Sequence, residues 1–337
     1  MNNHVLIAIL TIVLILSFIS YLLIIPLFKS KEITQTVRLI GPKEHYKKNR
    51  TPVLGGTIIV SGTLVGLYLL LYKNPLNISY SKSNLLILIV AFFGYFLLGL
   101  LDDLKIIKRR SNDGLSIKSK FIGELIIAVI IFFLSLTNNQ STIINLYGFK
   151  INLYFFYGLF LIFYFMSYTN AVNFTDGIDG LAGGVSLIVS ITLTIIAYKN
   201  HNYLIFYFGL SLITQLIAFL FFNINKAQIF MGDTGSLAIG GALAAMAIIL
   251  KVEMFMLVMG IVFLLEALSV VLQIYFYKKY KKRIFKMAPI HHHLELCKWN
   301  EWQIDILAWT ITTIFCILGF MLEVLLWKLI IITRNIF

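Results

Sequence analysis

Residues 4–28 read HVLIAILTIVLILSFISYLLIIPLF, without a single lysine, arginine, aspartate or glutamate. A helix that spans the hydrocarbon core of a bilayer needs about 20 mostly apolar residues, because each residue rises only about 1.5 Å. The run lacks the basic leading region and the small-residue cleavage site of a secretory signal peptide. We therefore expect a retained transmembrane helix.

Comparable runs recur along the chain. Of its 337 residues, 59% are hydrophobic and 13% are charged, whereas soluble proteins carry about 25% charged residues. This composition excludes a water-soluble enzyme, and two cysteines are too few for a disulfide scaffold. We predict an all-α polytopic membrane protein in which residues 1–337 form one integral membrane domain with ten transmembrane helices. The predicted spans are 4–28, 52–72, 84–101, 119–136, 153–169, 183–198, 203–222, 236–250, 254–277 and 304–327.

The basic residues alternate between the two ends of these spans. The first, third, fifth, seventh and ninth connections, counted with Lys120 at the start of the fourth span, contain 21 of the 28 lysines and arginines. Cytoplasmic loops carry such an excess, so we predict that these connections face the cytoplasm and that both termini lie outside. The net charge of +13 is then a topology signal, and we expect no nucleic-acid partner. On the outer side, residues 137–152 predict a small hairpin around Tyr147 and Gly148.

Five aspartates gather where apolar runs meet the predicted cytoplasmic loops. Asp102 and Asp103 follow the third span, Asp176 and Asp179 follow the fifth, and Asp233 precedes the eighth. A single one of them could be a helix cap. Desolvation penalises bare carboxylates at such depth, so five in three loops indicate a polar cavity or a bound cation. Carboxylates together with substrate phosphates suit Mg²⁺. Because these aspartates adjoin the predicted cytoplasmic loops, we predict that the active site lies on the cytoplasmic face.

The basic and interior polar residues divide into two groups. Most lysines and arginines are topology determinants or contacts to anionic lipid heads. Lys48, Lys105 and Lys120 stand beside glycine-proline turns or the aspartates, and we assign function chiefly to these. Polar side chains within spans usually face the bundle interior, where structural hydrogen bonding is expected. We expect this role for Glu124, Glu266 and Gln273.

The run MAPIHHH at 287–293 ends in three consecutive histidines, His291, His292 and His293. Adjacent histidines point in different directions, and no cysteine or carboxylate lies at the usual spacing of zinc ligands. Imidazoles can donate hydrogen bonds to phosphate oxygens and transfer protons. We therefore interpret the run as a loop that binds an anionic substrate.

Together these motifs resemble the phospho-N-acetylmuramoyl-pentapeptide transferase (translocase I) family of the polyprenyl-phosphate N-acetylhexosamine-1-phosphate transferase superfamily. They follow the family's order along nearly the whole chain, on the same ten-helix plan. The MAPIHHH run is the most specific, because the related N-acetylglucosamine-1-phosphate transferases read differently there. The matching stretches are Gly41–His45, Thr51–Gly56, Asp102–Asp103, Asn170–Ala182, Phe222–Asn223, Phe230–Ser236 and Met287–His293.

The resemblance implies a Mg²⁺-dependent transferase of the bacterial cytoplasmic (inner) membrane. Its partners would be UDP-N-acetylmuramoyl-pentapeptide, undecaprenyl phosphate, membrane lipids and a second copy of the chain. The products would be lipid I and UMP, in the first membrane step of peptidoglycan synthesis. The implied catalytic residues are Asp102, Asp103, Asp233 and His291, with Asp233 as the metal ligand. The implied substrate-binding residues are Lys48, Lys120, Asn173, Asp176, Asp179, Asn223, His292 and His293.

Some positions depart from the family pattern, and two other functions compete. Lys105 stands one residue closer to the aspartate pair than usual, Glu124 replaces a usual Gln, and Lys226 replaces a common Pro.

A sibling transferase for N-acetylglucosamine-1-phosphate would lack the histidine run. A secondary transporter would place its charges at the bilayer midplane, between repeated, interrupted helices.

Overall fold

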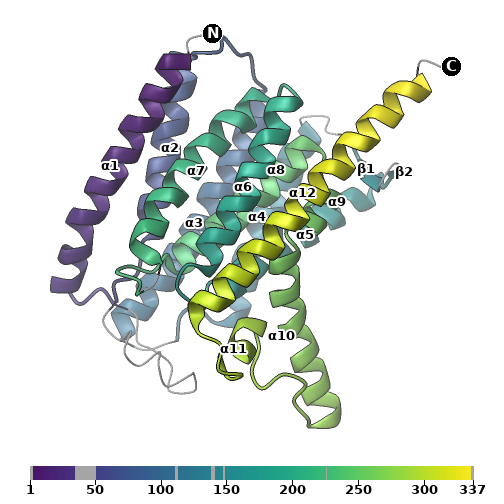
Figure 1. Ribbon diagram of the computed structural model, residues 1–337. Coiled ribbons are helices and arrows are strands. Elements are labelled where there is room, and N and C mark those ends of the chain that lie inside the picture. Colours follow the sequence, from purple (N-terminus) through teal and green to yellow (C-terminus); the bar gives the residue numbers. More distant parts are fainter. Residues whose placement is uncertain are drawn as a thin grey trace.

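The computed structural model describes residues 3–34, 51–110, 113–137, 141–146, 149–224 and 226–334. They form a bundle of long helices with one short hairpin at its side (Figure 1). The helices are α1 (Asn3–Ser30), α2 (Gly56–Lys73), α3 (Lys82–Arg109), α4 (Ile117–Thr137), α5 (Phe156–Thr175), α6 (Leu181–Lys199), α7 (Tyr203–Asn223), α8 (Gly232–Leu250), α9 (Glu253–Met259), α10 (Ile261–Tyr280), α11 (Ile290–Glu295) and α12 (Glu301–Arg334). The strands are β1 (Ile143–Leu146) and β2 (Phe149–Asn152).

Nine helices in the described ranges are long and apolar enough to cross a membrane. They confirm the prediction of a polytopic all-α membrane protein. The predicted span at 153–169 corresponds to α5, which is 20 residues long. Its tyrosines, together with Asn170 and Asn173, dilute its apolar character, so it is not among the nine. The count of ten spans therefore stays a prediction.

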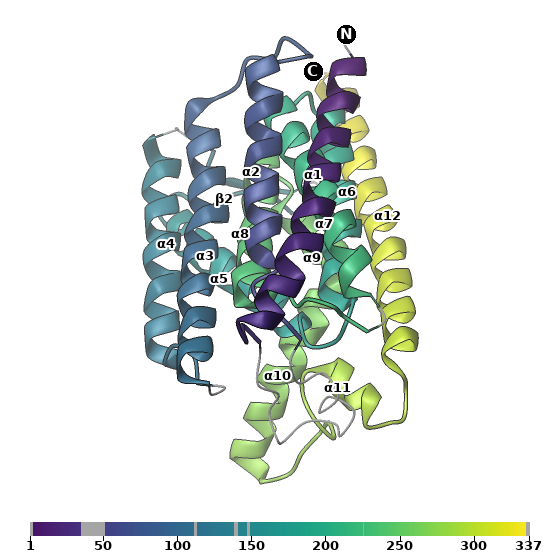
Figure 2. The same cartoon turned by 90° about the vertical axis from the view of Figure 1, so that its left-hand side faces the viewer.

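The two chain ends lie at one end of the bundle, and α11 lies at the other (Figures 1 and 2). The lower part of α10 projects beyond the neighbouring helices together with α11 (Figure 2). This arrangement agrees with an even number of crossings, while the side on which the termini lie stays a prediction. The predicted outer hairpin is present, because β1 pairs antiparallel with β2 from Ile143 opposite Asn152 to Leu146 opposite Phe149. Its central residues, 147 and 148, lie outside the described ranges.

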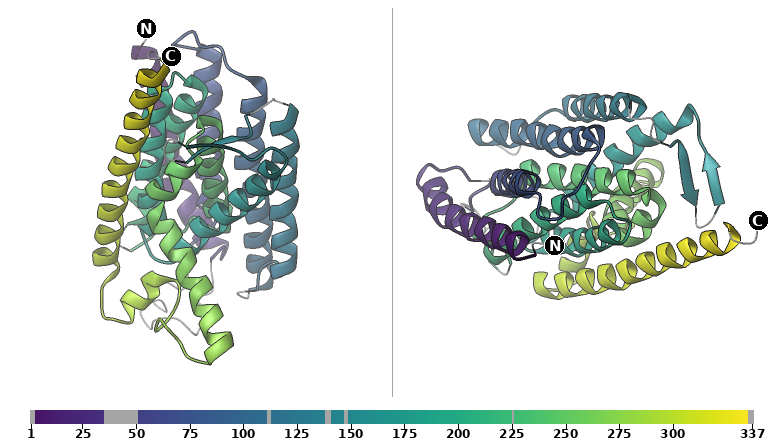
Figure 3. Two further views of the ribbon diagram at one scale, coloured as in Figure 1. Left: turned by 90° about the vertical axis from the view of Figure 1, so that its right-hand side faces the viewer. Right: turned by 90° about the horizontal axis from the view of Figure 1, so that it is seen from above.

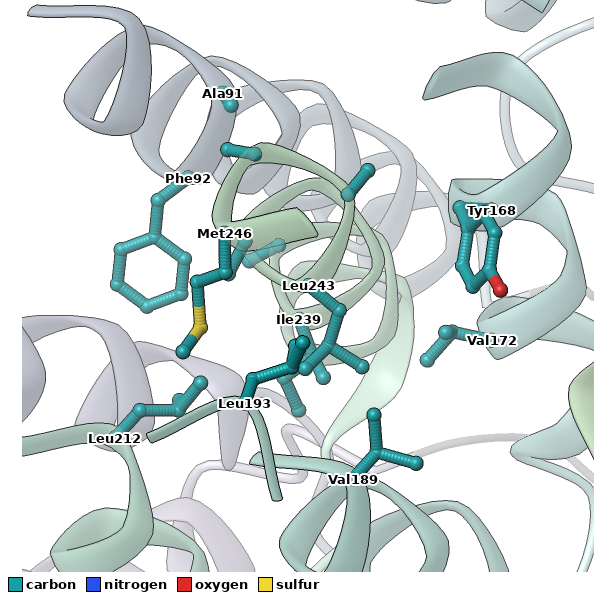
Figure 4. Close-up of a cluster of buried hydrophobic side chains, with 14 of the residues drawn as sticks. Ala91, Phe92, Tyr168, Val172, Val189, Leu193, Leu212, Ile239, Leu243 and Met246 are labelled. Carbon is teal, nitrogen blue, oxygen red and sulfur yellow. The ribbon is translucent and has the colours of Figure 1, made fainter. Parts of the chain in front are cut away.

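Helix α8 is the central helix of the bundle, and every residue from Thr234 to Leu250 is buried. Its sequence is rich in glycine and alanine, which lets neighbouring backbones approach closely where lipid supplies no hydrophobic force between helices. Larger side chains fill the gaps between the helices (Figure 4). Those drawn around α8 come from α3, α5, α6 and α7 and include Phe92, Val172, Leu193 and Leu212.

The outer helices are apolar on their outward faces. Helices α1, α4, α10 and α12 lie at the edge of the bundle when it is seen from above and from the sides (Figures 1 and 3). Large side chains such as Leu23, Phe133, Val271 and Leu325 are more than half exposed on them. Exposed apolar surface over the whole perimeter is what a lipid-facing bundle requires.

Several helix boundaries differ from the prediction. Helix α8 begins at Gly232 and not at residue 236, so Asp233 lies in its first turn and not in the loop before it. Helix α3 was expected to end at residue 101, but it continues to Arg109, so the aspartate pair lies inside the helix. The predicted span 254–277 is broken at Gly260 into α9 and α10. The Tyr168 hydroxyl donates a 2.6 Å hydrogen bond to the Met256 carbonyl there, and a Cβ on Gly260 would lie 2.9 Å from that hydroxyl. The break therefore accommodates a side chain of α5.

The close approach of α3 to α8 gives a testable prediction. A Cβ on Gly99 would overlap the backbone carbonyl of Asp233. We expect Gly99→Ala to destabilise the protein by about 2 kcal/mol, as overpacking does, and to lower its thermal unfolding midpoint in detergent. Gly94→Ala is the matched control on the same helix, because its Cβ would meet only the movable side chain of Ile127. Equal midpoints for the two variants would contradict this packing.

Candidate active site

The polar site is built around the first turn of α8. The Asp103 carboxylate, on α3, accepts hydrogen bonds from the backbone N–H groups of Thr234 (2.9 Å) and Asp233 (3.2 Å), and from the Thr234 hydroxyl (2.5 Å). The first N–H groups of a helix have no partner within the helix, and a negative charge is favoured beside them. Asp103, only 4% exposed, therefore caps α8 from a neighbouring helix. Gly232, with φ +69°, allows this approach because a Cβ there would collide with the carboxylate.

Asp233 is held by donors from two other helices. Lys120 Nζ, on α4, donates to Asp233 Oδ2 at 2.6 Å, and Asn173 Nδ2, on α5, donates to Oδ1 at 2.8 Å. Asn173 Nδ2 also lies 2.9 Å from the Ser236 hydroxyl, and its Oδ1 lies 3.4 Å from Lys120 Nζ. The Lys120 and Asp233 side chains are 20% and 24% exposed. Three predicted site residues thus meet at one solvent-accessible point.

Asp102 joins this cluster from the next position of α3. Its carboxylate interacts electrostatically with that of Asp233, and its Oδ1 accepts from the Leu115 backbone N–H at 2.5 Å. The Lys120 ammonium attracts both carboxylates. Two adjacent carboxylates beside one cation leave a negative charge that a second cation can neutralise.

The turn after α5 brings further carboxylates towards the cluster. Burial raises the pKa of Asp176 well above its usual range, and the negative charges of Asp233, Asp103 and Asp179 raise it further. The ionised form of Asp176 is therefore disfavoured until positive charge arrives. The shift indicates that these aspartates share one electrostatic environment.

Asp179 and Asn223 fix the shape of this turn. Asp179 Oδ2 accepts from the backbone N–H of Ala227 at 2.8 Å. The Asn223 amide accepts from the Gly180 N–H and donates to the Ile229 carbonyl, each at 2.9 Å. Both predicted substrate-binding side chains thus hold the two loops against each other.

Helix α12 supplies two acidic residues that the sequence motifs did not include. Glu301 Oε2 accepts from the Asp179 backbone N–H at 3.4 Å. Asp305 is 1% exposed, and one of its oxygens would lie 2.9 Å from a Cβ on Gly180, whose φ is +86°. An aspartate inside an apolar span was a signal in the sequence, because such residues face the protein interior.

The histidine run forms the short helix α11, not the loop that we predicted, and of its histidines only His291 faces the turn after α5. Glu266 Oε2, on α10, accepts from the backbone N–H of Ile290 at 2.8 Å and lies 3.1 Å from His291 Nδ1. The opposite ring nitrogen, Nε2, is directed at Gly177, where a Cβ would overlap it. It is buried without a hydrogen-bond partner among the described residues.

The other two histidines contact residues close to them in sequence. His292 Nδ1 lies 2.7 Å from Glu295 Oε2, and His293 Nδ1 accepts from the Lys286 backbone N–H at 3.1 Å. Successive residues of a helix are rotated by about 100°, so three adjacent histidines cannot face one site. The structure therefore brings one of the three to the turn that carries Asp176.

The interior polar residues have the structural roles that we predicted. Glu124, 2% exposed, accepts from Asn170 Nδ2 at 2.6 Å, and Gln273 Oε1 accepts from the backbone N–H of Phe285 at 3.0 Å. Glu266 orients α11 as described above. Lys105 is partly buried on α3, and Lys48 lies outside the described residues.

The donor set fits a cation that is shared with a substrate. No group of three or more histidine, cysteine, aspartate or glutamate side chains with metal-site spacing occurs in the part of the chain that the structure describes. Mg²⁺ is typically held by one or two carboxylates plus substrate phosphates and water. Asp233 and Asp102 supply two adjacent carboxylates of this kind. Because Lys120 and Asn173 already cover both oxygens of Asp233, a cation there would displace at least one donor.

Comparisons with known proteins identify the family of the chain. The model of Glycosyl transferase family 4 matches residues 85–251, which cover α3 to α8. The phospho-N-acetylmuramoyl-pentapeptide-transferase of Bacillus cytotoxicus is 39% identical over 300 residues, 88% of this chain and 91% of the relative. The Staphylococcus epidermidis protein of that name is 40% identical over 314 residues, 91% and 96% of the two chains. The Oceanobacillus iheyensis protein is 37% identical over 322 residues, 94% and 98%. The chain therefore belongs to the phospho-N-acetylmuramoyl-pentapeptide-transferase family.

Proposed function

We propose that the chain transfers phospho-N-acetylmuramoyl-pentapeptide from its UDP conjugate to undecaprenyl phosphate, giving lipid I and UMP. The similarity to transferases of this name covers nearly the whole chain. The observation that carries the proposal is the Asp233–Lys120–Asn173 cluster at one end of an apolar bundle. A water-soluble nucleotide sugar and a lipid phosphate can meet only at such an interface.

The reaction exchanges one pyrophosphate bond for another. An oxygen of the lipid phosphate attacks the phosphorus next to the sugar, and the bond from that phosphorus to UMP breaks. A phosphate monoester has its second pKa near 6, so the nucleophile is already largely ionised at neutral pH. The protein's main task is then to position the two phosphates and to neutralise their charge.

Each residue of the cluster has a separate role in positioning the phosphates or neutralising their charge. Asp233, with Asp102, would hold Mg²⁺, which when bound stabilises negative charge on the transferring oxygens. Lys120 carries an ammonium group beside the same point and would contact a phosphate oxygen. Asn173 orients Asp233, and Asp103 fixes the turn that carries it.

We assign the turn and the histidine helix to the nucleotide sugar. With Nδ1 bonded to Glu266, His291 presents Nε2 towards the Asp176 turn, where a substrate hydroxyl would donate to it or, when the ring is protonated, a phosphate oxygen would accept from it. Asp179 and Asn223 keep the turn in place. The predicted substrate roles of Lys48, His292 and His293 remain part of the proposal.

The position of the site also bears on how the protein is oriented and in which membrane it lies. The site lies at the α11 end of the bundle, since His291 of α11 lies against Gly177 in the turn after α5. The excess of lysine and arginine in the odd-numbered connections predicts that this end is cytoplasmic. We propose that this end faces the cytoplasm of a bacterium, that the protein lies in the cytoplasmic membrane, and that two copies associate. Because the carboxylates gather towards one end of the bundle, this geometry favours a transferase over a secondary transporter.

The reaction is tested by UMP release from the purified protein in detergent. With Mg²⁺ and undecaprenyl phosphate, we expect UMP from UDP-N-acetylmuramoyl-pentapeptide and none from UDP-N-acetylglucosamine. Chelation with EDTA should stop release, and added Mg²⁺ should restore it. UMP from the glucosamine substrate would move the chain to the sibling branch, and UMP from neither substrate would overturn the proposal.

Removing the central carboxylate separates catalysis from folding. We expect Asp233→Asn to lower the rate of UMP release at least about a hundredfold, because charge stabilisation at a reacting centre is lost. Its unfolding midpoint should stay within a few degrees of wild type. Glu323→Gln is the matched control, since Glu323 is a buried carboxylate paired with Lys199 at the opposite end of the bundle. Normal turnover in folded Asp233→Asn would remove Asp233 from the metal site.

Glu266 is expected to act only through His291. Both His291→Ala and Glu266→Gln should raise the KM for the nucleotide sugar, by roughly tenfold for the loss of a charge-assisted hydrogen bond. Adding Glu266→Gln to His291→Ala should have little further effect, because the ring that Glu266 orients is already gone. Multiplicative effects in the double variant would show that the two side chains act independently.

A further inference from the structure

Glu124 is a buried carboxylate that the proposed chemistry leaves unused. It lies on α4 and is 2% exposed. Its Oε2 accepts a 2.6 Å hydrogen bond from Asn170 Nδ2, whereas its Oε1 is buried without a partner among the described residues. An unsatisfied buried carboxylate oxygen is costly, so it calls for an explanation. A hydrogen-bond donor that reaches Oε1 in another state of the protein would explain it.

Lys120 is the donor in the right place. It precedes Glu124 by four residues, so the two side chains lie on the same face of α4. The Lys120 ammonium and the Glu124 carboxylate already attract each other electrostatically. In the present state Lys120 Nζ donates to Asp233 Oδ2 at 2.6 Å. A cation that takes this oxygen leaves the ammonium without its strongest partner.

We propose that Glu124 is a positioning residue that receives the Lys120 ammonium when a divalent cation binds Asp233. This inference rests on the cation site of the proposed function. The exchange replaces one N–H···O hydrogen bond by another and forms or breaks no covalent bond. An ammonium has three donors, so Lys120 can bond Glu124 and still present a donor to a substrate phosphate. Glu124 thereby offsets the cost of freeing Asp233 for the cation.

The inference is tested by calorimetric titration of the full-length protein in detergent with Mg²⁺ alone. Glu124→Gln retains an acceptor for Asn170 but turns an N–H towards Lys120. We expect it to weaken Mg²⁺ binding roughly tenfold, the effect of losing one charge-assisted hydrogen bond. In a Lys120→Met background the same substitution should change the affinity less than about twofold, since no ammonium remains to be received. Equal weakening in both backgrounds, or none in either, would overturn the inference.

Glu124→Asp separates contact from charge. It keeps the negative charge but shortens the side chain by one methylene, so the acceptor no longer reaches Lys120. We expect Mg²⁺ binding to weaken as in Glu124→Gln, and wild-type affinity in Glu124→Asp would overturn the inference. If Glu124→Gln unfolds, this variant decides alone, with its unfolding midpoint measured alongside.

Asp233→Asn distinguishes failure of the inference from failure of the proposed cation site. It should abolish Mg²⁺ binding. If it does so and the Glu124 effect is independent of Lys120, only the role of Glu124 is wrong. If Asp233→Asn binds Mg²⁺ normally, the cation site itself is wrong, and the inference falls with it.

Discussion

The Asp103 carboxylate against the first turn of α8 is the interaction on which the site depends. Helix α8 is buried from Thr234 onward, so the N–H groups of its first turn have little access to water. Asp103 satisfies those of Asp233 and Thr234 from a different helix. Without this cap, the turn that carries Asp233 would be an unsatisfied helix end within a membrane protein. One hydrogen-bonded carboxylate therefore couples the packing of α3 on α8 to the position of Asp233.

The packing of α3 on α8 also explains why the site is mostly buried and still open to solvent. Glycine and alanine on α8 bring α3 and α5 close, which places Asn173 of α5 beside Asp233, while Lys120 reaches the same carboxylate from α4. The apolar perimeter keeps the bundle in lipid, while the Asp233 side chain stays partly open to solvent. A site at a helix end therefore gives a polar substrate access and leaves the remaining length of each helix to the bilayer.

Much of this organisation could be predicted from the sequence. Long apolar runs determine where helices can lie, and the clustering of aspartates on one predicted face indicated the site. The side-chain partners could not be predicted in the same way. Nothing local distinguishes Asp102, beside Asp233, from Asp103, which caps α8, because the difference arises only when α3 packs on α8.

The helix boundaries show the same limit. The break at Gly260 depends on Tyr168 of α5, which no pattern within α9 and α10 reveals. Likewise, the sequence presents three equal histidines, and only the helical geometry of α11 selects His291.

Thermal unfolding of Asp103→Asn in detergent, measured beside UMP release, tests the central claim most directly. Asparagine keeps one acceptor but directs an N–H at the backbone of the α8 turn, so the account predicts a midpoint several degrees below wild type. A wild-type midpoint with lost turnover would place Asp103 in the chemistry and contradict its role as the cap.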